Sequence, residues 1–230
     1  ILGQPVPVFT GVRYLGTWKT QEEIDASGLT DPQVVGGPKY EDLNGDGIIS
    51  IEDNVILGDP TPDLTFGFEN SFSYKNWDLS FYFQGTTGNE MYNLRMRNHY
   101  FNRGENTKFG GIADRWKEGT NETSDILRAG SFNVTDTPSN SEYVEDGSYI
   151  RLKSAQLAYN FPVEKMGWDG VKDMRVYFSG TNLLLLSDFR LIDPETSHFG
   201  RSGLGNIAQG YANGGYPNPQ VLTLGLNVTF

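Results

Sequence analysis

The sequence predicts an all-β fold, in which about six long antiparallel strands form the C-terminal part of a large transmembrane β-barrel with long extracellular loops. Apolar and polar residues alternate over segments of about ten residues, long enough to cross a tilted hydrocarbon layer. The connections alternate between short and very long, as in outer-membrane barrels. Six strands are too few to close a barrel, so the outermost strands should pair with strands beyond this chain.

The clearest pair of strands spans 63–74 and 77–84, joined by the two-residue turn 75–76, and predicts a β-hairpin with long arms. The large apolar residues of this hairpin fall on one face of the alternation. They are Leu64, Phe66, Phe68, Phe72, Tyr74, Trp77, Leu79, Phe81 and Phe83.

Four further segments complete the predicted set. The last ten residues alternate regularly up to Phe230, and 174–179 does so over a shorter span. The segment 149–161 changes phase, which a β-bulge near Lys153-Ser154 would repair by adding one residue. A weaker strand covers 8–18, and 21–24 predicts a single helical turn.

The long connections are 19–62, 87–148 and 187–219, against the short 75–76 and 162–171. Placing Phe230 at the periplasmic side puts every long connection outside the cell. A secreted, calcium-binding β-sandwich, acting as an adhesin or carbohydrate-binding module with its apolar faces packed together, stays open as the alternative. It predicts a soluble monomer, whereas the barrel predicts aggregation without the remaining strands.

Composition excludes several other classes of protein. The 230 residues carry 18 Lys+Arg against 29 Asp+Glu, a net charge of −11 that disfavours nucleic-acid binding. The absence of Cys excludes disulfide scaffolds and thiol nucleophiles. No catalytic residues are predicted, because carboxylates such as Glu118, Glu122 and Asp125 have no diagnostic spacing. The chain opens with Ile1 and no signal sequence, so we expect processing or a piece of a longer protein.

Residues 42–53 fit the twelve-residue calcium-loop template and predict a structural Ca²⁺ site. Gly47 falls at the position of the sharp turn. The predicted ligands are Asp42, Asn44, Asp46, the carbonyl of Ile48, Ser50 and, at the last position, Asp53. An Asx- and Gly-rich turn without an ion is the alternative, because no clear helix flanks the loop.

The long loops are rich in aromatic and amide side chains, which suit both sugar faces and protein surfaces. Packing among the loops themselves is the alternative. The residues predicted to face a substrate or partner are Tyr92, Asn93, His99, Tyr100, Trp116, Tyr211, Asn213 and Tyr216.

Taken in order, several motifs resemble the C-terminal third or quarter of a SusC/RagA-type TonB-dependent outer-membrane transporter. The resemblance spans essentially the whole chain, and the ordered set is more specific than any one motif. The motifs are Tyr40–Gly47, Ile56–Pro62, Phe66–Phe68, Phe83–Gly85, Val144–Lys153, Ser179–Leu184, Tyr216-Pro217 and Leu226–Phe230.

This resemblance implies the outer membrane of a Gram-negative bacterium, a barrel of roughly 22 strands, and an N-terminal plug and TonB-interacting segment that this chain does not contain. It implies a SusD-like surface lipoprotein as partner, and oligosaccharides or peptides as cargo. Polar residues expected to face the lumen are Glu69, Asp78, Gln84, Arg151, Lys153 and Arg175. Residues expected to face lipid are Leu64, Phe66, Phe68, Phe81, Phe83, Leu224 and Leu226, with Tyr74 and Trp77 in the periplasmic aromatic girdle.

Overall fold

The computed structural model describes residues 3, 7–100, 110–129, 138–168, 170–190, 193–195, 209–213 and 216–230, with side chains at all of these except 98–100 and 110. The chain divides into two compact units. Unit 1 comprises 1–61, 90–145 and 197–214, and unit 2 comprises 62–89, 146–196 and 215–230.

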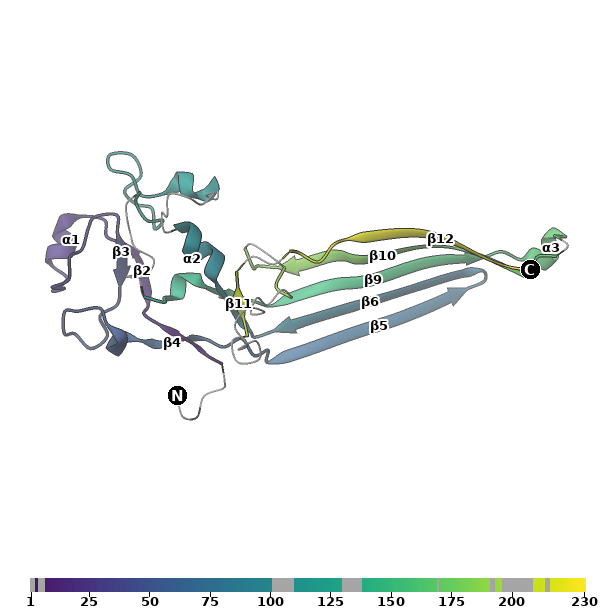
Figure 1. Cartoon of the computed structure of the whole chain (residues 1–230), viewed down its shortest axis with the longest axis horizontal. Coiled ribbons are helices and arrows are strands. Elements are labelled where there is room, and N and C mark those ends of the chain that lie inside the picture. The colour runs from purple at the N-terminus through teal and green to yellow at the C-terminus, as the bar shows by residue number, and fades with distance from the viewer. Residues whose placement is uncertain are drawn as a thin grey trace. The chain divides into compact units, whose positions relative to one another are not determined.

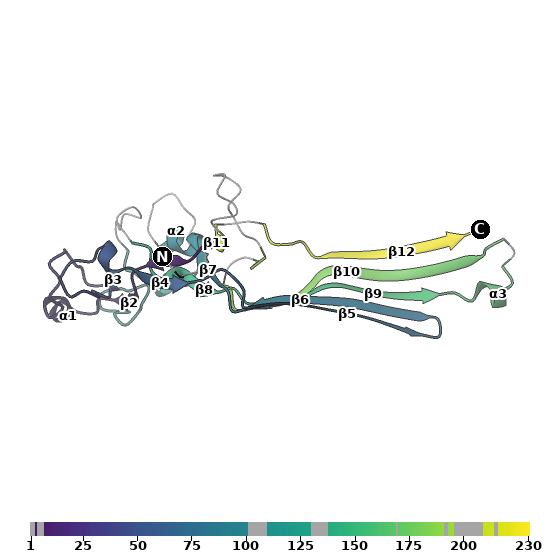
Figure 2. The same ribbon diagram turned by 90° about the horizontal axis from the view of Figure 1, so that it is seen from below.

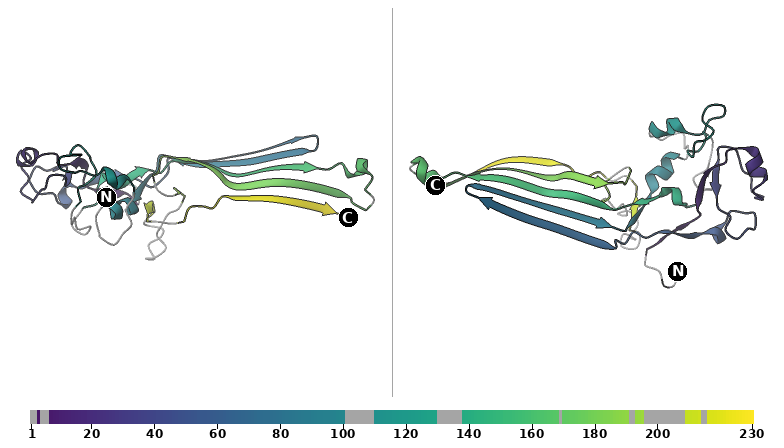
Figure 3. Two further views of the ribbon diagram at one scale, coloured as in Figure 1. Left: turned by 90° about the horizontal axis from the view of Figure 1, so that it is seen from above. Right: turned by 180° about the vertical axis from the view of Figure 1, so that it is seen from behind.

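Unit 2 is built on one five-stranded antiparallel sheet, the long sheet, with strand order β12-β10-β9-β6-β5. The strands lie side by side (Figures 1 and 3), and the turned view in Figure 2 shows a single layer. The elements are β5 (Leu64–Tyr74), β6 (Trp77–Thr87), β9 (Tyr149–Asn160), α3 (Val163–Met166), β10 (Asp173–Ser187) and β12 (Val221–Thr229).

The predicted hairpin is confirmed, with Tyr74 paired to Trp77 across the turn. Lys75 takes a left-handed φ of 55° there, which closes the two-residue connection. The predicted bulge is also confirmed. Between β6 and β9 the register passes from Tyr82–Ser154 to Phe83–Leu152, which leaves Lys153 without a partner.

Cross-strand register places most of the large apolar side chains of the five strands on one face of the long sheet, with exceptions such as Leu185, which pairs with Arg151. One row runs Phe83, Leu152 and Leu184, and another runs Leu79, Leu157, Phe178 and Leu224. Neither row is covered within unit 2. Phe68, which pairs with Phe83 and extends the first row, is 53% exposed, and Leu224 in the second row is 77% exposed. A soluble sandwich would bury such a face under a second sheet, and the described part of unit 2 has none.

Unit 1 contains short elements in three small sheets, with strand orders β1-β4, β2-β3 and β11-β7-β8. They are β1 (Phe9–Gly11), β2 (Tyr14–Thr17), α1 (Gln21–Asp25), β3 (Pro38–Tyr40), η1 (Ile51–Asp53), β4 (Val55–Gly58), β7 (Glu90–Asn93), α2 (Leu94–Tyr100), η2 (Gly110–Asp114), η3 (Ser141–Tyr143), β8 (Val144–Asp146) and β11 (Tyr211–Ala212).

The predicted strand over 8–18 is corrected, because the chain there forms the two short strands β1 and β2, which belong to unit 1 and not to the long sheet. Alternation fails at Gly11 and Val12, which are both buried, and Val12 makes an isolated bridge to Asn140. The helical turn expected at 21–24 is present as α1, capped by the side chain of Thr20, which accepts the N–H of Glu23. No helix among the described residues is long and apolar enough to span a membrane.

Candidate functional site

The polar face of the long sheet carries the residues that the sequence places in the lumen. Gln84 is paired with Arg151, and Arg175 with Asn160, so these side chains share the face opposite the apolar rows. The bulge brings the side chain of Lys153 close to those of Gln84 and Arg151, and all three contact Glu195. Two groups of polar contacts form on this face, one at each end.

The larger group, the Glu195 cluster, consists of Gln84, Tyr149, Arg151, Lys153, Asp193, Glu195 and Asn218. One carboxylate, that of Glu195, accepts hydrogen bonds from both strands β6 and β9. Gln84 Nε2 and Tyr149 Oη donate to its Oε1, the latter at 3.1 Å. Lys153 Nζ donates to Oε2 at 2.9 Å, and Arg151 Nε lies 3.2 Å from the same oxygen. This carboxylate is therefore held from several directions at once.

Arg151 and Asp193 form the buried centre of the cluster. The guanidinium Nη2 donates to Asp193 Oδ1, and both side chains are at most 3% exposed. The N–H of Glu195 donates to Asp193 Oδ1 at 3.1 Å, and that of Asn218 donates to Oδ2 at 3.0 Å. A buried charge without its partner costs about 3–5 kcal/mol, so each residue depends on the other. Residues 193–195 and 218 are thereby fixed against the wall formed by β9.

The second group lies toward the opposite end of the strands, around the carboxylate of Asp78. Ser73 Oγ donates to Asp78 Oδ1 and Asn160 Nδ2 donates to Oδ2, both at 2.7 Å. Arg175 Nη2 is 3.8 Å from Oδ2, an ion pair without a hydrogen bond. Asn76 Nδ2 donates to the carbonyl of Asn160 at 2.6 Å, which joins this group to the hairpin turn.

Sequence reasoning identified Gln84, Arg151 and Lys153 of the Glu195 cluster. It missed the fourth strand residue, Tyr149, and the residues that bind these four side chains. Asp193, Glu195 and Asn218 lie in the connection 187–219, whose pattern shows no partner for Arg151. The available signal for a carboxylate partner was the pair Arg151 and Lys153, two cations close together on the predicted lumen face, because a buried cation requires a carboxylate. That signal gives the chemistry of the partner and not its position, 42 residues further along the chain.

The predicted calcium loop folds on itself through side chain to backbone hydrogen bonds. Asp42 accepts the N–H groups of Gly45 and Gly47, at 2.7 and 2.9 Å. Asp46 accepts the N–H of Ile48 at 2.8 Å, and Gly47 takes the left-handed φ of 80° that the template requires. Among the described residues, no three or more His, Cys, Asp or Glu are grouped as a metal site. Calcium binding therefore stays a prediction.

Asp53 closes this loop from a buried position. Its Oδ1 accepts the N–H of Leu43 at 2.9 Å, and its Oδ2 accepts that of Ser50 at 2.8 Å. These backbone hydrogen bonds, that of Ser50 above all, hold the pKa of Asp53 below its ordinary value against the opposing effect of burial. The side chain of Ser50 accepts the N–H of Glu52 at the start of η1, which completes a capping box.

Three of the aromatic and amide loop residues, Tyr92, Asn93 and Trp116, are buried inside unit 1, and Tyr211 is partly buried there. Tyr92, 2% exposed, packs against the rings of Phe9 and Tyr211, with centroids 5.8 and 5.3 Å away. Asn93 accepts the N–H of Met96 and so caps α2. Trp116 is buried beneath Arg128, whose guanidinium lies 5.7 Å from the ring. These residues build the interior of the loops, the alternative that the sequence left open.

The remaining loop predictions divide into two groups. Asn213 and Tyr216 are exposed, the latter at 96%, and their role toward a substrate or partner stays a prediction. His99 and Tyr100 lie in α2, but their side chains fall outside the described part of the structure.

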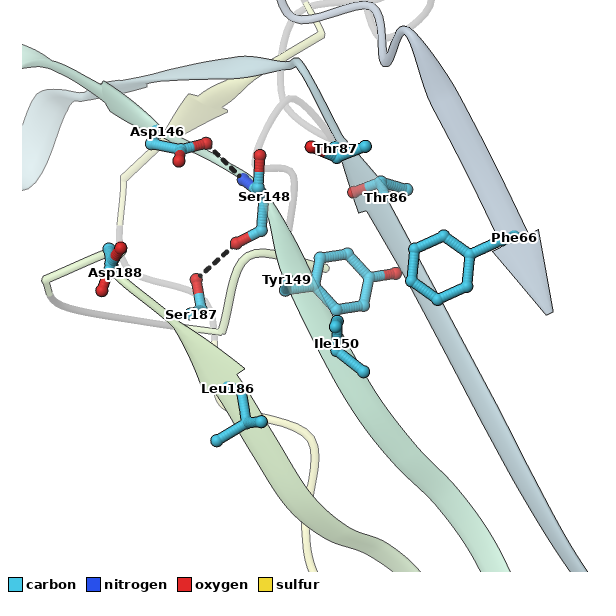
Figure 4. A pocket seen from close by; sticks show the side chains of 10 residues that line it. All are labelled: Phe66, Thr86, Thr87, Asp146, Ser148, Tyr149, Ile150, Leu186, Ser187 and Asp188. Carbon is cyan, nitrogen blue, oxygen red and sulfur yellow. Dashed lines mark hydrogen bonds between the residues drawn. The ribbon is translucent and has the colours of Figure 1, made fainter. Parts of the chain in front are cut away.

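A pocket of about 450 Å³, here named the rim pocket, lies where β9 begins and β6 and β10 end. Apolar side chains of Phe66, Ile150 and Leu186 form one part of its lining. Asp146, Ser148 and Asp188 contribute polar atoms (Figure 4). The N–H of Ser148 donates to Asp146 at 2.8 Å, and Ser187 Oγ donates to the carbonyl of Ser148 at 2.9 Å.

Comparison with known proteins gives several matches across the whole chain, although no family model matches. TonB-dependent receptor P26 of Formosa agariphila is 73% identical over 230 residues, which are 100% of this chain and 23% of that protein. TonB-dependent receptor P3 of the same bacterium is 35% identical over 233 residues, which are 99% of this chain and 22% of that protein. TonB-dependent receptor SusC of Bacteroides thetaiotaomicron is 24% identical over 83% of this chain and 17% of its own length.

Among solved structures, the RagAB peptide transporter matches with a TM-score of 0.70 and 21% identity, covering 97% of this chain and 22% of the matched chain. The RagAB peptide importer in its open-open state matches with a TM-score of 0.69 at the same identity and the same coverage. The chain thus spans less than a quarter of the length of the relatives and structures that it matches.

Proposed function

Because the chain belongs to the SusC/RagA-type TonB-dependent receptors of the outer membrane, we propose that it forms the C-terminal wall of a nutrient importer. In this proposal the importer takes up oligosaccharides or peptides together with a SusD-like surface lipoprotein. The five strands of the long sheet cross the membrane, and the connections 19–62, 87–148 and 187–219 lie outside the cell. No reaction is assigned to the chain, since import makes and breaks no bond at these residues.

The observation that carries the proposal is the division of the long sheet into an uncovered apolar face and a polar face with buried ion pairs. From Leu64 to Tyr74 the strand is about 33 Å long, which at a tilt of 35–45° spans about 23–27 Å of bilayer. This matches the apolar band of an outer-membrane barrel, about 25 Å tall. Trp77 and Tyr159, with ring centroids 4.8 Å apart, lie where the periplasmic aromatic girdle is expected.

The Glu195 cluster gives the polar face a specific task in this proposal. It fixes residues 193–195, at the start of the connection 187–219, to the inner wall. A loop that is tied at its base narrows the lumen by a constant amount, so the cluster would help to set the width of the path for cargo. RagAB, a peptide transporter by description, supports peptides as one of the two cargo classes.

The remaining partners follow from the family. The TonB complex would act through a region that this chain does not contain, and further strands and a plug would complete the barrel. The lipid of the outer membrane would surround the apolar face. A SusD-like lipoprotein would sit over the external connections.

Accessibility on intact cells tests the proposed orientation. In the full receptor, an epitope is inserted beside Ile51, which is 81% exposed, and separately in the turn at Lys75-Asn76. We expect antibody to bind the first epitope on intact cells, and the second only after the outer membrane is permeabilised. Binding to the second epitope on intact cells would place the turn outside and contradict the proposal.

Uptake tests the importer itself. Cells with the intact receptor, cells without it and cells without TonB are given labelled maltooligosaccharides or labelled tryptic peptides of casein. We expect uptake of one class to depend on both proteins. Uptake of both classes that is equal in all three strains would argue against import through this receptor.

We also propose that residues 42–53 bind Ca²⁺ as a structural ion. The donor set is entirely oxygen, and a carboxylate has about four lone-pair sites, so Asp42 and Asp46 keep acceptor capacity while holding the loop amides. Asp53 has less acceptor capacity left for an ion, because its carboxylate already accepts three backbone N–H groups.

Thermal unfolding of the purified receptor, in Ca²⁺ and in EGTA, tests this site. We expect Ca²⁺ to raise the Tm of the wild type, and the increment to vanish in Asp46→Asn but persist in Asp114→Asn, a matched charge change elsewhere in unit 1. An equal increment in Tm in all three proteins would show that the stabilising Ca²⁺ does not bind this loop.

A further inference from the structure

We propose that Asn44 is a site of spontaneous deamidation, which the folded loop 42–53 holds in check and which is modified when this loop opens. The inference rests neither on import nor on a bound ion. It follows from the residue after Asn44, from the partners of the Asn44 side chain and from the partner of the N–H of Gly45.

Deamidation of asparagine, a thermolabile residue type, begins with an attack by the chain on itself. The backbone nitrogen of the next residue loses its proton and bonds to the side-chain Cγ, the bond from Cγ to Nδ2 breaks, and ammonia leaves. The product is a cyclic succinimide, which water opens to aspartate or to isoaspartate. Two features therefore control the rate, the freedom of the asparagine side chain and the ease with which the following N–H gives up its proton.

Gly45 makes this position chemically susceptible, because it has no side chain to obstruct the attack. Its φ of 74° is left-handed, a conformation that glycine adopts without strain, so the loop favours glycine here. Asn44 and Gly45 are both exposed. Apart from its chain neighbours, no heavy atom of the described residues lies within 4 Å of the position that a Cβ of Gly45 would take. Water therefore has access to a succinimide formed at this point.

Hydrogen bonds hold both polar atoms of the Asn44 side chain. Its Oδ1 accepts the N–H of Asp46 at 2.9 Å, and its Nδ2 donates to Asp46 Oδ2 at 2.9 Å and to Glu52 Oε2 at 3.3 Å. Ring closure turns the planar amide into a tetrahedral carbon and expels Nδ2, so the reaction forfeits these hydrogen bonds. The acceptors are carboxylates in two of the three cases, and hydrogen bonds to charged groups are the stronger ones.

The attacking nitrogen is held as well. The N–H of Gly45 donates to Asp42 Oδ1 at 2.7 Å, and the other oxygen of this carboxylate accepts the N–H of Gly47 at 2.9 Å. A hydrogen bond to the protonated form of a group, and a negative charge beside it, both disfavour loss of its proton. Asp42 thus protects Asn44 from the residue that would attack it.

The modification would be irreversible for the loop. Isoaspartate carries the backbone through the former side chain, which inserts an additional carbon between residues 44 and 45. Asp46 and Gly47 would then be displaced relative to Asp42, whose carboxylate spans the N–H groups of Gly45 and Gly47. A loop that has opened and reacted would be unable to re-form the same hydrogen bonds.

Deamidation rates in the folded and unfolded receptor test the proposal. The intact receptor is purified in detergent, and samples in EGTA, with and without guanidinium chloride to unfold the protein, are incubated at the same pH. Peptide mapping by mass spectrometry, with fragmentation that separates aspartate from isoaspartate, follows Asn44. We expect the rate in the folded receptor to be lower by about tenfold or more, the equivalent of one hydrogen bond to a charged group. Equal rates in the two samples would overturn the proposal.

Asn213, which is also followed by a glycine, calibrates the chemistry. In the unfolded sample the two asparagines should react at similar rates, because each then has only its neighbours along the chain. An Asn44 that stays unreactive in the unfolded receptor while Asn213 reacts would show that the fold is not what protects it.

Paired variants identify the protecting group. Asp42→Ala removes the acceptor of the Gly45 N–H, and Asp25→Ala is the matched control, since that carboxylate accepts from Gln21 Nε2 on α1. In the folded receptor we expect Asp42→Ala to bring the rate at Asn44 close to that of the unfolded chain, and Asp25→Ala to leave it at the wild-type value. An unchanged rate in Asp42→Ala would refute the role of this carboxylate. If Asp42→Ala does not reach the membrane, the comparison of folded and unfolded wild type still decides whether the loop protects Asn44.

Discussion

The phenol ring of Tyr177 lies over Gly225, its register partner on the adjacent strand β12. A Cβ atom at Gly225 would come within 2.2–2.4 Å of two ring carbons and the hydroxyl oxygen of Tyr177. The ring thus fills the space that a side chain would occupy on the polar face. A comparable close approach occurs on the apolar face, where a Cβ at Gly85 would lie 2.5 Å from Phe66 Cζ.

These two glycines predict different responses to a double substitution. Gly225→Ala should destabilise the receptor by about 1–3 kcal/mol through overpacking, and Tyr177→Ala should relieve much of that cost, since the contacts are with a side chain. Gly85→Ala should cost as much or more, without relief from Phe66→Ala, because the carbonyl oxygen of Tyr149 is 2.4 Å from the added Cβ. Thermal unfolding of the single and double variants measures both couplings, and additive effects in the Tyr177 pair would contradict this account.

Substitution of Arg151 is expected to reduce the order of the start of the connection 187–219. Arg151→Met removes the guanidinium that donates to the buried carboxylate of Asp193, and breaking a buried ion pair costs about 3–5 kcal/mol. We expect faster hydrogen exchange at the N–H groups of Glu195 and Asn218, both of which donate to that carboxylate. Adding Asp193→Asn should restore part of the protection, because it removes the buried negative charge that Arg151 no longer offsets. Unchanged exchange in Arg151→Met would show that the ion pair does not hold this segment.

The apolar face predicts sensitivity to charge in the middle of β5. Phe68→Arg places a cation among lipid tails at a cost of about 2–4 kcal/mol if the residue is near the midplane. We expect a clear fall in the yield of folded receptor in the outer membrane. Ser71→Arg on the same strand is the matched control and should be tolerated, since Ser71 lies on the polar face of the sheet, opposite Phe68. A normal yield of Phe68→Arg would contradict the placement.

The 42–53 loop predicts a dependence of local stability on pH. Because the pKa of Asp53 is lower in the folded loop than in the unfolded chain, mainly through the N–H of Ser50, its contribution is fully present above the unfolded pKa of about 3.9. That contribution is lost as the pH falls through the folded pKa.

Hydrogen exchange of this loop between pH 6 and pH 3, corrected for intrinsic rates, measures the effect. We expect protection to fall on the acid side in the wild type. In Asp53→Asn the protection should be weaker at pH 6 and nearly independent of pH. If protection falls equally at low pH in both proteins, the pH dependence comes from a group other than Asp53.

Much of unit 2 could be predicted from the sequence because its information is local. Alternation with period two sets the faces of β5, β6 and β12, and the phase change in β9 locates the bulge to within a residue. The polar residues predicted to face the lumen include both cations of the Glu195 cluster. These inferences need only neighbours along the chain.

The predictions that failed or stayed incomplete depend on contacts between distant segments. The break between β1 and β2 follows from the bridge of Val12 to Asn140, which no local pattern announces. Tyrosine is a residue type that is common in binding sites, yet Tyr92 and Tyr211 pack on Phe9 and on each other. Only the fold decides whether an aromatic residue in a long loop faces inward.

The bulge in β9 has a consequence for how this strand tolerates change. In its pairing with β6, removing Lys153 would leave Ser154 opposite Tyr82 and Leu152 opposite Phe83, which is the register already present. Hydrogen bonding to β6 therefore has no need of this residue, and its own contact is with Glu195. Deleting the codon of Lys153 would remove that ammonium group, and Leu152 and Ser154 would keep their partners Phe83 and Tyr82 on β6.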